Sequence, residues 1–210
     1  MTWGMNRSRR SSWIWRGSVA SRRVIVVVAS LVLGGMTSFA QGWLPDSLNS
    51  LSNSSSGWTI LTVVLILWSG FRFPVAAVAG AVSFVLLVVG YTIASELRGL
   101  TYNPTQWGVI GLLAGPFVGT ATAWLRERDH RGALGTGLLA GIGIGEAVYG
   151  LTVVDDTTSP VYWTIIGVVG ALLLIGMLTA RLRGVVAVIV ALSTTVVVAG
   201  GTLIGYQIIG

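Results

Sequence analysis

The fold is decided by an apolar stretch, ALGTGLLAGIGIGEAVYGLT (residues 133–152), in which glycine recurs every four residues and one carboxylate is embedded. A run of about 20 apolar residues can span the hydrocarbon core of a bilayer as a helix. Gly137, Gly141 and Gly145 would lie on one face of that helix, with Glu146 beside them. The stretch therefore predicts a transmembrane helix with a small-residue face.

Six further runs of suitable length flank this one, at 24–40, 57–71, 74–95, 107–125, 161–180 and 184–206. The run at 57–71 is the shortest, and Pro74 after it suits the first turn of a new helix. The whole chain is 53% hydrophobic and 10% charged, whereas a soluble domain carries about 25% charged residues. We predict an all-α integral membrane protein, with a basic tail at 1–23 and a seven-helix transmembrane domain at 24–210.

The distribution of arginine predicts the orientation of the bundle. Every basic residue apart from His130 is Arg, and with seven spans all but Arg98 fall in the N-terminal tail or in loops on the same side. Asp46, Glu96, Asp155 and Asp156 fall on the other side. Cytoplasmic loops are enriched in positive charge, so we expect a cytoplasmic N-terminus and a multi-pass protein of the cell membrane.

The N-terminal run has an alternative interpretation. A basic region, an apolar run and the small-residue pattern Ser38-Phe39-Ala40 also resemble a secretory signal peptide. Cleavage after Ala40 would leave six spans. A start-anchor helix explains the same residues, and we favour it.

Several chemistries are disfavoured by composition. The chain has no Cys and one His, so thiolate metal sites are excluded and a histidine cage is improbable. The run at 126–131 alternates in charge sign and indicates a solvated connection, not a nucleic-acid patch. We predict no metal, no cofactor and no nucleic-acid partner. The lipid bilayer and a lipophilic small molecule are the expected partners, and the oligomeric state is left open.

The glycine pattern has two interpretations. Gly111, Gly115 and Gly119 in the run at 107–125 repeat the spacing seen at 133–152. Small residues let helix backbones approach closely in lipid, so tight packing of these helices along glycine grooves is the structural interpretation. Missing side chains could instead leave room for a ligand, and the two uses can coexist at different depths.

Glu146 is the strongest functional candidate. An ionisable group within a span costs about 2.5–3.5 kcal/mol on insertion scales, which makes it a functional hypothesis by default. Burial would favour the neutral acid, which can donate a proton. Tyr149 is almost one turn further along the same face. The structural alternative is a hydrogen bond between Glu146 and a neighbouring helix, for example to Ser or Thr.

Other polar and aromatic groups are predicted at the same level of the bundle. The polar stretch 49–56 is a candidate lid. The residues expected near Glu146 are Gln41, Asn53, Trp58, Tyr91, Glu96, Arg98, Tyr102 and Trp107. Aromatic faces stabilise cations, so this cluster suits either cation-driven chemistry on a polyene or the binding of an aromatic or cationic molecule.

Short glycine-rich segments carry a resemblance to a known group of proteins. The chain resembles a family of small actinobacterial multi-pass membrane proteins of unknown function, in the segments 35–41, 53–58, 90–91, 96–99, 115–119 and 141–146. Small seven-pass proteins of this general type include the membrane-bound terpene cyclases of bacterial indole-terpenoid pathways, which are similar in architecture to fungal meroterpenoid cyclases.

The resemblance implies proton-initiated, metal-independent cyclisation of a prenyl chain on an indole or meroterpenoid substrate. Glu146 would be the acid, with Tyr149 and Glu96 as further catalytic candidates. Trp58, Tyr91 and Trp107 would line the pocket and stabilise the cations, and Gln41, Asn53, Arg98 and Tyr102 are the remaining substrate-binding candidates. A small-molecule transport or binding subunit and a structural assembly protein are the alternatives.

Overall fold

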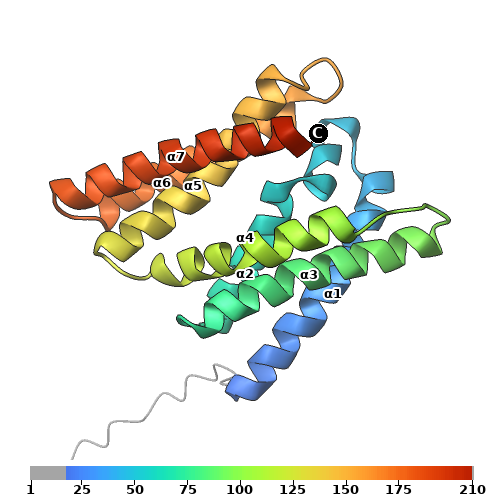
Figure 1. Cartoon of the computed structure of the whole chain (residues 1–210), viewed down its shortest axis with the longest axis horizontal. Helices are drawn as coiled ribbons and strands as arrows, with labels where there is room; N and C mark the ends of the chain where they lie inside the picture. The colour runs from blue at the N-terminus through green and yellow to red at the C-terminus, as the bar shows by residue number, and fades with distance from the viewer. Residues whose placement is uncertain (1–17, 210) are drawn as a thin grey trace, which may run out of the picture.

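The computed structural model describes residues 18–209 and is helical from end to end (Figure 1). Residues 1–17 of the predicted tail lie outside the described residues. The elements are α1 (Val19–Trp43), η1 (Asp46–Asn53), α2 (Ser55–Ser69), α3 (Val75–Leu97), α4 (Thr105–Trp124), α5 (His130–Thr152), α6 (Pro160–Ala180) and α7 (Val185–Ile209). The first helix begins before the predicted boundary at residue 24, because the Ser18 hydroxyl caps it by accepting from the Ser21 N–H at 3.2 Å.

Six helices are long and apolar enough to cross a membrane, namely α1, α3, α4, α5, α6 and α7. They correspond to six of the seven predicted runs. The remaining run forms α2, which has only 15 residues and would extend about 22 Å at 1.5 Å per residue. The short 3₁₀ helix η1 precedes it at an angle of 64°, so this part of the chain is a bent pair.

The long helices form two groups with α2 between them (Figure 1). Helices α1 and α4 both pack on α3, and helices α6 and α7 both pack on α5. The contact between α4 and α5 joins the groups, and α2 touches both α3 and α5. The cavity described below lies at the junction of these groups.

Glycine sets how closely these helices approach. On α4, a Cβ added to Gly119 would lie 2.0 Å from the Ala76 carbonyl oxygen of α3. On α5, a Cβ at Gly141 would lie 2.8 Å from the Thr195 carbonyl oxygen of α7. The predicted grooves therefore exist, and each is occupied by a helix of the same chain, since α3 packs into the groove of α4 and α7 packs into the groove of α5.

Arginine side chains donate hydrogen bonds to backbone carbonyls near the carboxyl terminus of α2, at the end of the bundle that we call the arginine end. Arg22 donates to the Ser69 carbonyl at 3.1 Å, and Arg126 donates to the carbonyls of Leu67 and Phe71 at 2.8 and 3.0 Å. A guanidinium offers five donors in a fixed fork and suits the unpaired carbonyls at a helix carboxyl terminus. We call the opposite end, which holds Asp46, Glu96, Asp155 and Asp156, the acidic end.

The polar stretch 49–56 is not a separate lid. Its first half belongs to η1, and its second half starts α2, because Ser54 takes an extended conformation and caps that helix. The Ser54 hydroxyl accepts from the Gly57 N–H at 3.0 Å. This segment therefore delivers the amino terminus of α2 to the level of Glu146.

Candidate functional site

The candidate site is built around the amino terminus of α2, which begins inside the bundle. Glu146 lies six residues before the end of α5, about 9 Å along the axis from the acidic end. Its side chain is fully buried, with 0% exposure. Among the residues that the structure describes, it is the only charged side chain in the buried core.

Both Glu146 oxygens accept hydrogen bonds from the backbone of α2. Oε1 accepts from the Ser55 N–H at 2.9 Å, and Oε2 accepts from the Ser56 N–H at 2.7 Å. The first N–H groups of a helix have no intrahelical partner and carry the positive end of its dipole. Glu146 thus caps α2 from another helix, which realises the structural alternative considered for this residue.

Two hydroxyl groups extend the hydrogen bonding of Glu146. The Tyr206 hydroxyl on α7 donates to Oε1 of Glu146 and lies 2.6 Å from Oγ of Ser55. Tyr149 stacks on Tyr206, with ring centroids 4.7 Å apart. The buried carboxylate is therefore connected to Ser55 Oγ by one intervening hydroxyl.

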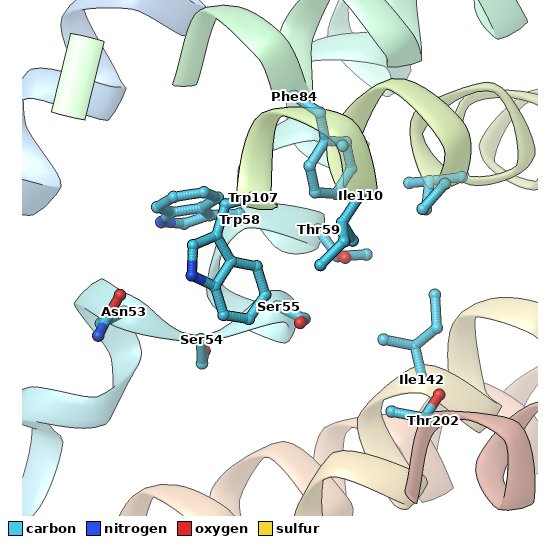
Figure 2. A pocket seen from close by; sticks show the side chains of 13 residues that line it. Asn53, Ser54, Ser55, Trp58, Thr59, Phe84, Trp107, Ile110, Ile142 and Thr202 are labelled. Carbon is cyan, nitrogen blue, oxygen red and sulfur yellow. The ribbon is translucent and has the colours of Figure 1, made fainter. Parts of the chain in front are cut away.

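Ser55 lies on the wall of a cavity of about 160 Å³ between the two helix groups. Figure 2 shows Trp58 and Trp107 on one side of the cavity and Ile142 and Thr202 across from them. Phe84 and Ile110 cover another side. The wall is mostly apolar, and its polar groups are hydroxyls and the Asn53 amide.

The cavity continues between helices α4 and α7. A second hollow of about 140 Å³ shares four wall residues with it, Ser55, Trp107, Ile110 and Thr202. Gly205 and Tyr206 complete the second hollow, which places it between α4 and α7. Helix α4 packs mainly on α3 and helix α7 packs mainly on α5, so the hollow lies between two helices that are not each other's main partners.

Four aromatic side chains form a continuous row that begins on the cavity wall and runs toward the acidic end. Trp58 lies 6.4 Å from Trp107 and 5.8 Å from Tyr91, measured between ring centroids, and Tyr91 lies 4.7 Å from Tyr102. The Tyr91 hydroxyl donates to the Gln41 side chain at 2.9 Å. Burial, with a smaller contribution from Tyr91, raises the pKa of Tyr102 to about 12.

The central cavity is lined by three of the predicted site residues, Asn53, Trp58 and Trp107, and the other predicted residues do not reach its wall. Glu96 is exposed at the end of α3 and lines none of the cavities described here, which separates it from its proposed catalytic role. Arg98 donates to the Ser38 carbonyl and lies over the Phe39 ring, 5.5 Å from its centroid. It joins α1 to α3 instead of lining the binding cavity.

The sequence interpretation missed Tyr206, Ser55, Ser56, Phe84, Ile110 and Thr202. The serines carried a usable signal, since Ser54 directly before an apolar run is a typical N-cap. A tyrosine hydroxyl inside an apolar run also requires a partner, which could have pointed to Tyr206. Phe84, Ile110 and Thr202 carried none, because nothing in an apolar helix marks the face that borders a cavity.

The chain belongs to a family of unknown function, DUF6518, whose model matches residues 16–210. This confirms the expectation that it is a member of a family of unknown function. No curated protein and no solved structure matches the chain.

Proposed function

We propose that this protein takes a lipophilic small molecule from the bilayer into the central cavity and cyclises a prenyl chain on it by protonation. The observation that carries the proposal is the apolar, aromatic cavity with Ser55 on its wall, since Ser55 Oγ is linked through Tyr206 to a buried carboxylate. The hollow between α4 and α7 supports uptake from the bilayer. The proposal keeps η1 and α2 as the seventh crossing of the membrane.

The hydrogen bonds provide a path for the proton. In its acid form Glu146 would donate to the Tyr206 oxygen, Tyr206 would donate to Ser55, and Ser55 would protonate an alkene or epoxide in the cavity. Protonation of the alkene, or opening of the protonated epoxide, leaves a carbocation on the substrate. The π electrons of a second double bond then attack this carbocation, and the new carbon–carbon bond closes a ring. Loss of a proton back through Ser55 and Tyr206 to Glu146 completes an isomerisation.

The aromatic groups suit the cationic intermediates of this reaction. The ring faces of Trp58 and Trp107 border the cavity, and each aromatic face attracts a nearby cation by roughly 0.5–2 kcal/mol. An apolar wall also keeps water from quenching the cation before ring closure.

The test compares products by mass spectrometry from membranes supplied with farnesylated indole and epoxidised prenyl-arene substrates. Wild type should form a product of unchanged mass and new retention time. The informative variants are Ser55→Ala and Tyr206→Phe, because each interrupts the hydroxyl path and leaves the backbone N–H bonds to Glu146 in place. Glu146→Gln is a weaker test, since its amide NH₂ would face an N–H of α2.

Binding without chemistry is the second candidate, and one observation favours it. Both Glu146 oxygens are engaged by the amino terminus of α2, which is what a purely structural cap requires. A binding or transport subunit would return its ligand unchanged, so saturable binding without a new product would select this function. The structural assembly alternative loses its motivation, because helices of the same chain fill the glycine grooves.

A further inference from the structure

A polar vestibule adjoins the central cavity at the acidic end. Its volume is about 660 Å³, and η1 together with the loop before α6 supplies most of its wall. The side chains that matter here are Gln41, Asp46, Asn49, Asn53 and Thr157. Asn53 also lines the central cavity, so the two spaces meet at this residue.

The chemistry of the vestibule differs from that of the central cavity. Gln41, Asn49 and Asn53 each carry an amide, which both donates and accepts hydrogen bonds. The other wall residues carry hydroxyls, apart from Asp46, and no basic residue lines this space. Sugar-like hydroxyls both donate and accept as well, whereas a phosphate would meet the Asp46 carboxylate without a compensating cation.

Some of these groups are already engaged, which leaves the rest for a ligand. The Gln41 oxygen accepts from Tyr91, and the Thr157 hydroxyl donates to the Val154 carbonyl at 3.2 Å. The amide NH₂ groups of Gln41 and Asn49 remain as donors, since the structure gives them no protein acceptor among residues 18–209.

We propose that the ligand is an amphiphile with an uncharged polyhydroxyl head, which occupies the vestibule while its apolar body fills the central cavity. This inference rests on the proposed function, because it requires a ligand in that cavity. The inference adds the chemical class of the ligand's head group to the proposed function. The vestibule should bind uncharged glycolipid-like molecules in preference to phospholipids.

The test uses a dibrominated hexyl chain, short enough for the central cavity, attached to a glucosyl, a phosphate or an ammonium head and added to the protein in phosphatidylcholine nanodiscs. Bromine quenches the fluorescence of nearby tryptophan. The difference in quenching between wild type and Trp58→Phe therefore reports a brominated chain inside the central cavity. The glucosyl probe should bind about tenfold more tightly than the phosphate probe, equivalent to one or two hydrogen bonds.

Variants locate the head group. Asn49→Ala should weaken the glucosyl probe about three- to tenfold and leave the phosphate probe unchanged. Asp46→Lys should reverse the preference between glucosyl and phosphate heads. Thr152→Ala is the control for both variants, because Thr152 lies at the same end of the bundle but lines neither the vestibule nor the central cavity.

The outcomes separate the two proposals. Equal Trp58-dependent quenching by all three probes, or tighter binding of the phosphate or ammonium probe, would overturn the head-group inference and leave the proposed function intact. Absence of Trp58-dependent quenching by every probe would instead remove the proposed function itself.

Discussion

Removal of the Glu146 carboxylate should destabilise the fold more than removal of any exposed carboxylate. In Glu146→Ala, the N–H groups of Ser55 and Ser56 and the Tyr206 hydroxyl lose their acceptor in a buried site. Each unsatisfied buried donor costs about 1–3 kcal/mol. Because three donors are affected, we expect a loss of about 3–5 kcal/mol, near the lower end of their sum.

The assay is thermal unfolding in detergent, monitored by tryptophan fluorescence. For a chain of this size, 1 kcal/mol corresponds to about 2–4 °C, so the midpoint should fall by on the order of 10 °C. Glu146→Gln keeps one acceptor oxygen and should lose only about 1–3 kcal/mol.

Glu96→Ala is the matched control, because the Glu96 side chain is exposed and its carboxylate has no hydrogen-bond partner among residues 18–209. Its stability should stay within about 0.5 kcal/mol of wild type. If Glu146→Ala were equally harmless, the carboxylate would not be holding the amino terminus of α2, and the geometry proposed for the site would be wrong.

Three further predictions concern packing, helix ends and orientation. Gly34→Ala should cost about 1–3 kcal/mol in the same thermal assay, because its Cβ would lie 2.1 Å from a backbone oxygen of α3, whereas Gly176→Ala, with open space around it, should be neutral or slightly stabilising. Arg126→Lys should lower the unfolding midpoint, since one ammonium cannot reproduce the fork that bonds the Leu67 carbonyl of α2 and the Phe71 carbonyl just after it; an unchanged midpoint would show that these bonds contribute nothing. In this cysteine-free chain, a membrane-impermeant maleimide applied to intact cells should label Thr157→Cys and spare Arg128→Cys, and the reverse pattern would invert the predicted orientation.

The hydropathy pattern predicted most of the helices because each long helix needs its own apolar run to cross lipid. Glu146 could be found for the same reason, since a carboxylate within such a run is costly and therefore conspicuous. The partners of the glycine grooves could not be predicted. Regular spacing of small residues shows that one face of a helix can pack closely against another helix. It does not identify the partner, because many apolar helix faces can pack against such a face.

The sequence interpretation also placed Glu96 and Arg98 in the site because they fall at the right level of the bundle. The depth of a residue along the bundle does not determine on which side of its helix the side chain projects. Glu96 faces outward at the end of α3, and Arg98 bonds the neighbouring α1. Tyr206 was missed for the converse reason, because it comes 60 residues after Glu146 and only the folded bundle brings the two together.

The dependence of α2 on distant residues has a consequence for biosynthesis. A ribosome makes Ser55 well before Glu146, which is 91 residues later, and before Tyr206, which is 151 residues later. Until α5 is inserted, the amino terminus of α2 has no acceptor within lipid. We expect this segment to stay near the membrane surface during synthesis and to take its place only when the second group of helices arrives, so that chains truncated before α5 would lack the cavity altogether.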